Sequence, residues 1–166
     1  MKKYVNPCSM KWPMSPGATP YEEPKLIHGG MSVDQRGYVG YCNDFQFAGI
    51  QRFYTVENFY TQQVRAWHGH RQEHKYVLCT QGAALVAAVP IDDWEHPDKD
   101  SAVWTKVLTG MMGDIYHIPP GHANGFMSLE PDTHLIFFST STLEESSQDD
   151  IRYTWDYWNP WEVPQS

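Results

Sequence analysis

The densest group of residues able to do chemistry lies in residues 64–76, which read VRAWHGHRQEHKY. Side chains alternate between the two faces of an extended strand, so His68 and His70 are predicted to point to the same side. If that side lines the interior of a barrel, both imidazoles enter one pocket. The alternative is an edge strand that leaves both histidines in water. Arg65, Trp67 and Tyr76 bracket the cluster and favour the pocket, because such groups are common in binding sites.

Short strands joined by turns are predicted for most of the chain. The 166 residues include 12 Gly and 12 Pro, and no helical periodicity of useful length occurs before Glu144. Strands are expected at residues 76–80, 83–91, 102–108, 115–118 and 134–138. Gln81-Gly82, between the first two, is typical of a hairpin turn. The sequence therefore predicts an all-β sandwich or barrel, and closure of a barrel would remove exposed strand edges.

Two spacings resemble the two sequence motifs of the cupins. The slots of the first motif, His-x-His, an acidic residue and Gly, are filled here by His68, His70, Lys75 and Gly82. The slots of the second motif, Gly, Pro-x-Gly and His, are filled by Gly113, Pro119, Gly121 and Asn124. The resemblance implies an all-β fold, a cupin-type jelly-roll β-barrel.

The departures from these motifs bear on metal binding. A cupin metal site takes its ligands from the two histidines of the first motif, its acidic residue and the histidine of the second. Lys75 cannot ligate a cation, and Asn124 is a poor ligand for a transition metal. Two histidines are fewer than the three protein ligands usual in catalytic zinc sites. We therefore expect no metal and no cofactor, while a ligand set of His68, His70 and His122 stays open as an alternative.

A cupin that carries histidine and lysine in its pocket resembles the dTDP-4-dehydrorhamnose 3,5-epimerases. The resemblance rests on residues 34–38, the element Arg65-x-x-His68, Lys75, the loop 118–126 and the segment 146–158. It spans about residues 26–162 at scattered positions. A sister group, the sugar-nucleotide 3,4-ketoisomerases, carries a His-x-His after its arginine, as this chain does with His68 and His70.

The resemblance implies a nucleotide-diphosphate 4-keto-6-deoxy sugar as substrate and no metal in the reaction. A carbon beside a ketone is acidic only because its carbanion is stabilised as an enolate. The reaction therefore needs a base with a near-neutral pKa and a cation at the developing oxyanion. His68 is the implied base, and Lys75 is the implied oxyanion stabiliser. The implied substrate-binding residues are Arg36, Arg65, Asn58, His70, His122 and Asn124.

Several of these residues also have a purely structural interpretation. The two arginines suit diphosphate and sugar oxygens, because guanidinium makes bidentate contacts. Arg36 could equally be a surface residue of a turn, and Arg65 could pair with a carboxylate such as Glu57. Asn58 could make a turn bond, and His122 could face the mouth of the barrel.

Two departures separate the chain from the epimerases. The resemblance implies a tyrosine proton donor on a late strand, where this chain has Phe137. It also implies a carboxylate partner for the base beyond the aromatic tail, and the sequence ends at Ser166 without an evident one. A 3,4-ketoisomerase, a metal-dependent cupin enzyme and a non-catalytic sugar-binding cupin therefore remain as alternatives.

Charge and composition restrict the partners. The formal net charge of −8, from 12 basic and 20 acidic residues, argues against a nucleic-acid surface. No apolar run approaches the roughly 20 residues of a membrane span, and none follows the first lysines as a signal peptide would. Three widely separated cysteines predict reduced thiols and a cytoplasmic location.

The chain is predicted to divide into an arm and one domain. Residues 1–25 carry five prolines and are expected to form an extended arm. Residues 26–166 are expected to form a single cupin-type barrel with an aromatic C-terminal segment. Trp155, Trp158 and Trp161 in that segment are expected to pack as a lid. The arm and the strand edges predict a homodimer.

Overall fold

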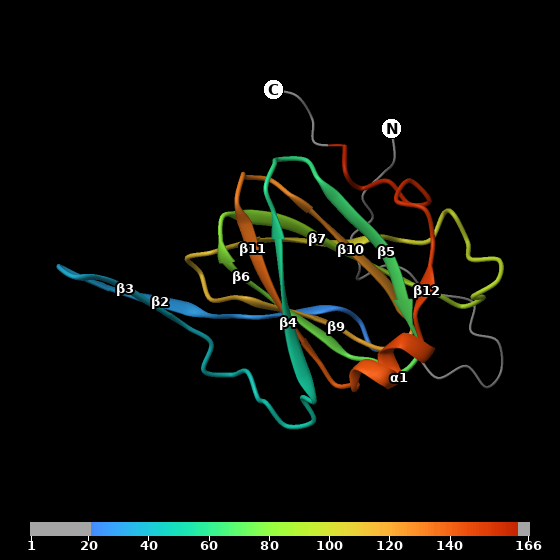
Figure 1. The fold of residues 1–166 in the computed structure, drawn as a ribbon, viewed down its shortest axis with the longest axis horizontal. Coiled ribbons are helices and arrows are strands. Elements are labelled where there is room, and N and C mark those ends of the chain that lie inside the picture. Colours follow the sequence, from blue (N-terminus) through green and yellow to red (C-terminus); the bar gives the residue numbers. More distant parts are fainter. Residues whose placement is uncertain (1–20, 163–166) are drawn as a thin grey trace.

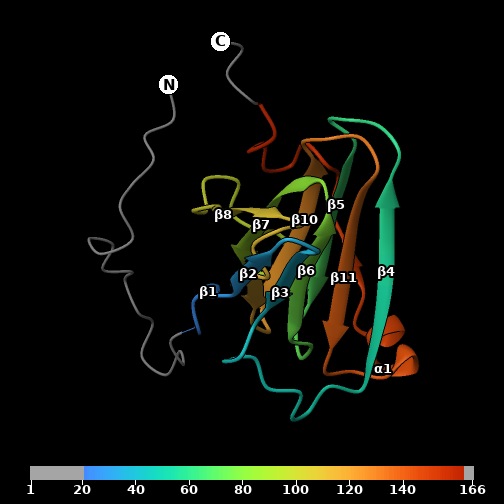
Figure 2. The same cartoon turned by 90° about the vertical axis from the view of Figure 1, so that its left-hand side faces the viewer.

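The structure is a computed structural model that describes residues 21–162. Two five-stranded sheets face each other, and a two-stranded hairpin projects from them (Figures 1 and 2). The first sheet has the order β1 (Lys25–Ile27), β9 (Ile115–Ile118), β6 (Lys75–Gln81), β11 (Thr133–Ser139) and β4 (Arg52–Asn58). The second has the order β12 (Ile151–Arg152), β5 (Val64–His70), β10 (His122–Ser128), β7 (Ala83–Pro90) and β8 (Trp104–Thr109). The hairpin consists of β2 (Gly30–Asp34) and β3 (Gly37–Tyr41), and the short helix α1 (Leu143–Gln148) follows β11.

All strand pairs in the described part of the chain are antiparallel. Two facing antiparallel sheets are the arrangement of a jelly roll, so the prediction of an all-β cupin-type barrel is confirmed. The five strands predicted from the sequence correspond to β6, β7, β8, β9 and β11.

The predicted hairpin at Gln81-Gly82 is wrong. Strand β6 pairs with β9 and β11, whereas β7 pairs with β10 and β8, so the chain crosses between the two sheets at this point. Gly82 has a φ of 71°, and a Cβ there would lie 2.5 Å from Thr133 Oγ1. The glycine signals a tight turn correctly, but a turn residue does not determine which strands pair across it.

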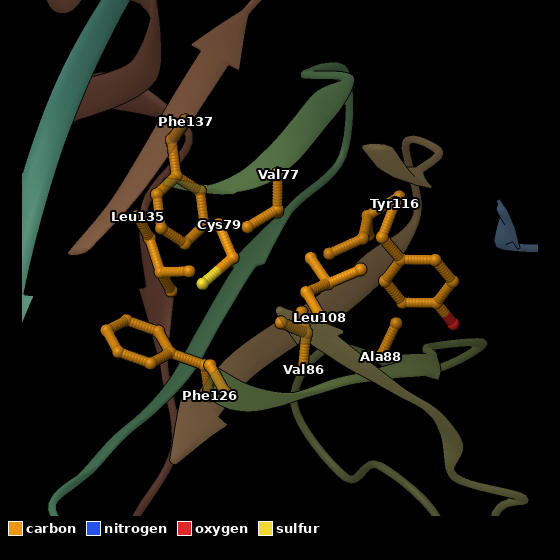
Figure 3. Packing of buried hydrophobic residues seen from close by; sticks show 11 residues of the cluster. Val77, Cys79, Val86, Ala88, Leu108, Tyr116, Phe126, Leu135 and Phe137 are labelled. Carbon is orange, nitrogen blue, oxygen red and sulfur yellow. The ribbon is translucent and has the colours of Figure 1, made fainter. Parts of the chain in front are cut away.

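The space between the sheets is filled by inward side chains that alternate along each strand. In β6 the buried positions are Lys75, Val77 and Cys79, and in β11 they include Leu135 and Phe137. Figure 3 shows the apolar members of this set meeting residues of β7, β8, β9 and β10 in one cluster. Lys75 belongs to the inward series as well, which places its ammonium at one end of this apolar cluster.

The C-terminal segment covers the outer face of the second sheet. Trp67, on β5, lies in a buried cluster with Trp158 and Trp161, and its Nε1 donates to the carbonyl oxygens of Trp155 and Trp158. The predicted packing role is confirmed for Trp158 and Trp161. Trp155 is 54% exposed and is not part of that cluster.

Most of the predicted arm lies outside the described residues. Tyr21, near the start of the described chain, donates a hydrogen bond from its hydroxyl to the Ile91 carbonyl at 2.9 Å. Its ring meets that of His122 edge-on, with centroids 6.4 Å apart. The division of the chain at residue 25 stays a prediction. Within residues 21–162, no helix is long and apolar enough to cross a membrane.

Candidate active site

Strand β5 directs His68 and His70 into the space between the two sheets, as the alternation predicts. Trp67, the residue before His68, packs on the opposite face in the cluster under the C-terminal segment. Burial lowers the pKa of both imidazoles most, and the positive charge of Lys75 on the facing sheet lowers the pKa of each further. The two histidines therefore share one interior site, and the edge-strand alternative is wrong.

His68 has a carboxylate partner within the chain. Its Nδ1 lies 3.5 Å from Asp150 Oδ1, and Arg152 donates from Nε to the other carboxylate oxygen at 2.9 Å. Strand β12 brings the carboxylate there, because Ile151 pairs with Gly69. The expectation that the base would lack such a partner is wrong.

The surroundings of His68 suit a base at neutral pH. Burial lowers its pKa below the ordinary 6.5, Lys75 and Arg152 lower it further, and Asp150 acts in the opposite direction. The ring is therefore neutral at pH 7 and has a free nitrogen that can accept a proton. A side chain still 35% exposed remains open to a ligand.

Lys75 is the first residue of β6 and is 6% exposed. Burial lowers the pKa of its ammonium below 10.5, while the charge of Glu73 raises it. Glu73 has the same parity as Lys75 along the chain, and its carboxylate is fully buried. An ammonium buried in the interior can act as a positive charge for an oxyanion.

Glu73 is the centre of a buried polar network that joins three parts of the fold. It accepts hydrogen bonds from Ser139 Oγ at 2.5 Å and from Ser146 Oγ at 2.8 Å. His70 Nδ1 lies 3.0 Å from it and Arg52 Nη2 lies 3.6 Å from it. Burial alone would raise the pKa of Glu73, but the charge of Lys75, the two serine hydroxyl groups and His70 hold it below its ordinary value.

Asn58, the last residue of β4, and Arg65, near the start of β5, form a second polar pair. Lys75 is level with Arg52, at the other end of β4. Arg65 donates from Nε to Asn58 Oδ1 at 2.8 Å, and Asn58 Nδ2 donates to the Gln63 carbonyl at 3.0 Å. The structural alternative for Arg65, a pair with Glu57, is wrong, because Glu57 lies 3.1 Å from His134 Nε2. Arg65 is exposed, so its guanidinium can still meet a ligand.

Asn124 and His122 lie on β10, beside the two histidines of β5. Asn124 Nδ2 donates to the backbone carbonyl of His68 at 2.8 Å, so this amide fixes the strand that carries the base. His122 pairs with His70 across the strands, and its Nδ1 lies 3.1 Å from the carbonyls of both Pro119 and Pro120. It is 2% exposed, which contradicts a position at the mouth of the barrel.

The structure does not bring Arg36 to this site. It lies in the turn between β2 and β3, and its side chain is 85% exposed and paired with Asp34. Figure 1 shows this hairpin extending from the barrel on the side opposite β5 and β12.

The other candidate features of the described residues lie away from the two histidines of β5. Within residues 21–162, one group of three side chains has potential metal-ligand atoms within 4.8 Å of one another, and it consists of Glu22, His74 and His117. Two of the nitrogens in that group already face each other at 2.9 Å, from His74 to His117. Hollows of about 310 and 370 Å³ are lined by residues such as Tyr41 and Tyr76, respectively, and by none of the predicted site residues.

The arrangement is suited to removing a proton from carbon. A neutral imidazole with a carboxylate 3.5 Å away lies on one sheet, and a buried ammonium lies on the other. Asp150 and Glu73 were not predicted as site residues. Glu73 could have been found from the sequence, because a residue two positions before an inward-facing lysine is expected to face the same way. Asp150 could not, because it reaches His68 only through the pairing of β12 with β5.

Comparison with known families and structures identifies proteins with the same fold. No curated protein sequence matches the chain. The chain is similar to dTDP-4-dehydrorhamnose 3,5-epimerase from Bacillus anthracis, with 17% identity, 90% of each chain covered and a TM-score of 0.70. It is also similar to a sugar 3,4-ketoisomerase from Thermoanaerobacterium thermosaccharolyticum (16% identity, 81% and 90% covered, TM-score 0.60). A 3'-monoepimerase from Streptomyces bikiniensis shares the fold too (16% identity, 75% and 67% covered, TM-score 0.60).

These likenesses establish the fold, and the sequence match establishes the family. The profile of the dTDP-4-dehydrorhamnose 3,5-epimerases matches residues 19–159, which include both sheets, the two histidines of β5 and the carboxylate that faces His68. The chain therefore belongs to the dTDP-4-dehydrorhamnose 3,5-epimerase family.

Proposed function

We propose that the protein is a metal-independent epimerase or isomerase of a nucleotide-diphosphate 4-keto-6-deoxy sugar. His68 removes the proton from the carbon beside the ketone, and Lys75 stabilises the enolate oxygen. The observation that carries the proposal is the opposition of the His68–Asp150 pair to the buried Lys75 across one barrel interior. Family membership supports the same reaction class.

The polar groups around this centre suggest how the sugar nucleotide is held. Arg65, fixed by Asn58 where β4 ends and β5 begins, is placed to meet phosphate or sugar oxygens. Asn124 holds the backbone of His68, so its contribution is to position the base. The similar epimerase from Bacillus anthracis was solved with TDP and diphosphate bound, which supports a thymidine nucleotide as the carrier.

A 3,4-keto shift is the second candidate, and His70 is the observation that favours it. Moving the carbonyl requires protons to leave and arrive at neighbouring positions of one enediol, so two acid–base groups on one face are useful. His70 shares its face with His68 and has its own carboxylate at 3.0 Å in Glu73. The similar ketoisomerase was solved in complex with TDP.

Product analysis tests the proposal and separates the two candidates. TDP-4-keto-6-deoxyglucose, the sugar in a structure of a similar ketoisomerase, is incubated with the protein and followed by proton NMR. The proposal expects a 3-epimer, a 3,5-epimer or a 3-keto sugar. An unchanged substrate that nevertheless binds the protein would favour a non-catalytic sugar-binding cupin.

A homodimer is part of the proposal. Among residues 21–162, strands β2 and β3 pair with each other and with no other strand, and isolated two-stranded hairpins are marginally stable in water. The hairpin exposes Val33 (67%) and Val39 (65%), which a second copy of the chain would cover. In such a dimer, Arg36 at the tip of the hairpin could contact a ligand in the barrel of the second copy, which agrees with its predicted phosphate contact.

Light scattering at micromolar concentration tests this assembly. We expect a dimer mass for the parent protein and a monomer mass for Val33→Asp with Val39→Asp. Val107→Asp, at an exposed valine of β8, is the matched control and should leave the mass unchanged. A monomer mass for the parent would contradict the proposed dimer.

A cytoplasmic location is also proposed. Cys42 and Cys79 are free, and burial raises the pKa of both thiols. Cys8 lies outside the described residues. Thiols that stay reduced fit a reducing compartment, and cell fractionation with an antibody against the protein tests the location.

A further inference from the structure

We propose that Ser146 is a positioning residue of the reaction, whose hydrogen bond to Glu73 docks helix α1 and thereby holds Asp150 beside His68. The assignment rests on the proposed function, since the place of Asp150 affects the rate only if His68 is the base. Ser146 does not touch the reacting atoms. It acts through the short stretch of backbone that joins it to Asp150.

Helix α1 is short and buries no apolar side chain. It has six residues, and isolated helices shorter than about 12 to 15 residues are marginal in water. A capping box of Thr142 and Glu145 fixes its first turn. Of residues 143–148, Ser146 alone is buried, whereas Leu143 is 69% exposed. The contact of Ser146, rather than apolar packing, therefore attaches this helix to the barrel.

The hydrogen bond from Ser146 is buried and has a charged acceptor. Ser146 Oγ donates to Glu73 Oε2 at 2.8 Å, and both residues are buried. Burial opposes ionisation of Glu73, but the charge of Lys75, the serine hydroxyl groups and His70 keep its pKa below the ordinary value, so the carboxylate is charged at neutral pH. Hydrogen bonds to ionised acceptors are roughly twice as strong as those between neutral groups. Ser146 therefore makes a strong link for an uncharged side chain.

Glu73 lies in the turn that joins the strand of the base to the strand of Lys75. Strand β5 ends at His70 and β6 begins at Lys75, so residues 71–74 connect the two. In the same turn, the backbone N–H of Gln72 donates to Asp149 Oδ2 at 2.9 Å. The end of α1 is thus tied at two points to the turn that follows β5 (Figure 1).

Asp150 lies between this attachment and strand β12. It follows Ser146 by four positions, and two positions later Arg152 pairs with His68 across β12 and β5. Asp150 Oδ1, which lies 3.5 Å from His68 Nδ1, is buried and accepts no hydrogen bond within residues 21–162. The distance from the carboxylate to the ring therefore depends on how firmly the backbone is held on both sides of Asp150.

Displacement of Asp150 would change the base in a defined direction. The charged groups that act on His68 are Asp150 and Arg152 from β12 and Lys75 from β6. Burial, Lys75 and Arg152 all lower the pKa of the imidazole, and Asp150 is the group that raises it. A carboxylate that moves away would lower this pKa further. The ring would then be a weaker base, with no change in the residues that bind the nucleotide.

The variant Ser146→Ala tests the role, because it removes one hydroxyl and introduces the residue with the highest helix propensity. With TDP-4-keto-6-deoxyglucose in deuterated water, we expect kcat/KM for deuterium uptake to fall about tenfold to a hundredfold, mostly in kcat. The acidic limb of the pH profile should move to lower pH, and so should the titration of the His68 ring followed by NMR. Ser147→Ala is the matched control and should behave as the parent, because its exposed hydroxyl donates to the Leu143 carbonyl of its own helix.

A double-mutant cycle with Asp150→Asn tests whether Ser146 acts through Asp150. Asp150→Asn keeps the shape of the side chain and removes its charge, so it should slow the exchange more than Ser146→Ala does. Adding Ser146→Ala to Asp150→Asn should then have little further effect, because no carboxylate is left to position. An equal loss in both backgrounds would overturn the assignment, since Ser146 would then act through another group, such as His70 beside the same oxygen of Glu73.

The other outcomes separate this role from the proposed function. The parent's rate and pH profile in Ser146→Ala would overturn the assignment while leaving the proposed function intact. A lower melting temperature together with the parent's pH profile would show a structural role alone and would also overturn it. A parent protein that shows no exchange would overturn the proposed function and the role of Ser146 with it.

Discussion

Removal of the Glu73 carboxylate tests the buried polar network whose charge acts on Lys75. The substitution Glu73→Ala takes away the acceptor of two serine hydroxyl groups and the nearest negative charge to His70. Breaking a buried ion pair by removing one partner costs about 3 to 5 kcal/mol. For a domain of this size the melting temperature should fall by about 6 to 20 °C.

The loss of stability in Glu73→Ala should depend on pH, and the direction follows from the lowered pKa of buried Lys75. The folded pKa of Lys75 already lies below the unfolded value of 10.5, and removing Glu73 lowers it further. At pH values between the folded and unfolded pKa of Lys75, the unfolded chain holds more protons on this group than the folded chain, so stability rises with pH. The deficit of the variant should therefore be largest near neutral pH and shrink toward pH 10.

Calorimetry or circular dichroism at several pH values measures both effects. The control is Glu57→Ala, which removes a carboxylate that is 40% exposed and pairs with His134. An exposed pair contributes about 0 to 1 kcal/mol, so this variant should melt close to the parent. Equal melting temperatures for the two variants, or a Glu73→Ala deficit that grows with pH, would refute the reasoning.

Three further predictions concern binding and catalysis. Arg65→Ala should weaken binding of a nucleotide-diphosphate sugar about tenfold to a hundredfold by calorimetry, because a charge-assisted contact contributes roughly 1.5 to 3 kcal/mol; unchanged affinity would show that the pocket is misplaced. The pH dependence of kcat/KM should be bell-shaped, because the neutral form of His68 is lost as pH falls through a pKa below 6.5, and the charged form of Lys75 is lost as pH rises through a pKa below 10.5; a rate that keeps rising above pH 10.5 would contradict the role of Lys75. Activity should survive chelation, since Lys75 and Asn124 occupy ligand slots of the motif; one equivalent of zinc, iron or manganese per chain, with activity lost on its removal, would contradict this.

The sequence predicted the parts of the site that depend on local rules. Alternation along β5 placed His68 and His70 on one face, and motif spacing placed Lys75 in the same interior. Both follow from the period of a strand and from short chain distances. The fold class followed from the same alternation together with the turn residues.

Features that depend on pairing between distant segments could not be predicted. The turn at Gly82 reads as a hairpin locally, but the partners of β6 and β7 come from other parts of the chain. Asp150 reaches His68 only because the two-residue strand β12 joins the edge of β5. Tyr54 meets Phe137 through a register that joins residues 83 positions apart, and no local pattern encodes it.

The central claim is that His68 removes a proton from the carbon beside a ketone, and deuterium exchange tests it most directly. In deuterated water, a TDP-4-keto-6-deoxy sugar should acquire deuterium at that carbon with the parent protein, detected by NMR or mass spectrometry. His68→Asn should abolish the exchange, because asparagine keeps the polarity but cannot accept the proton. Exchange by His68→Asn at the parent rate would contradict the account.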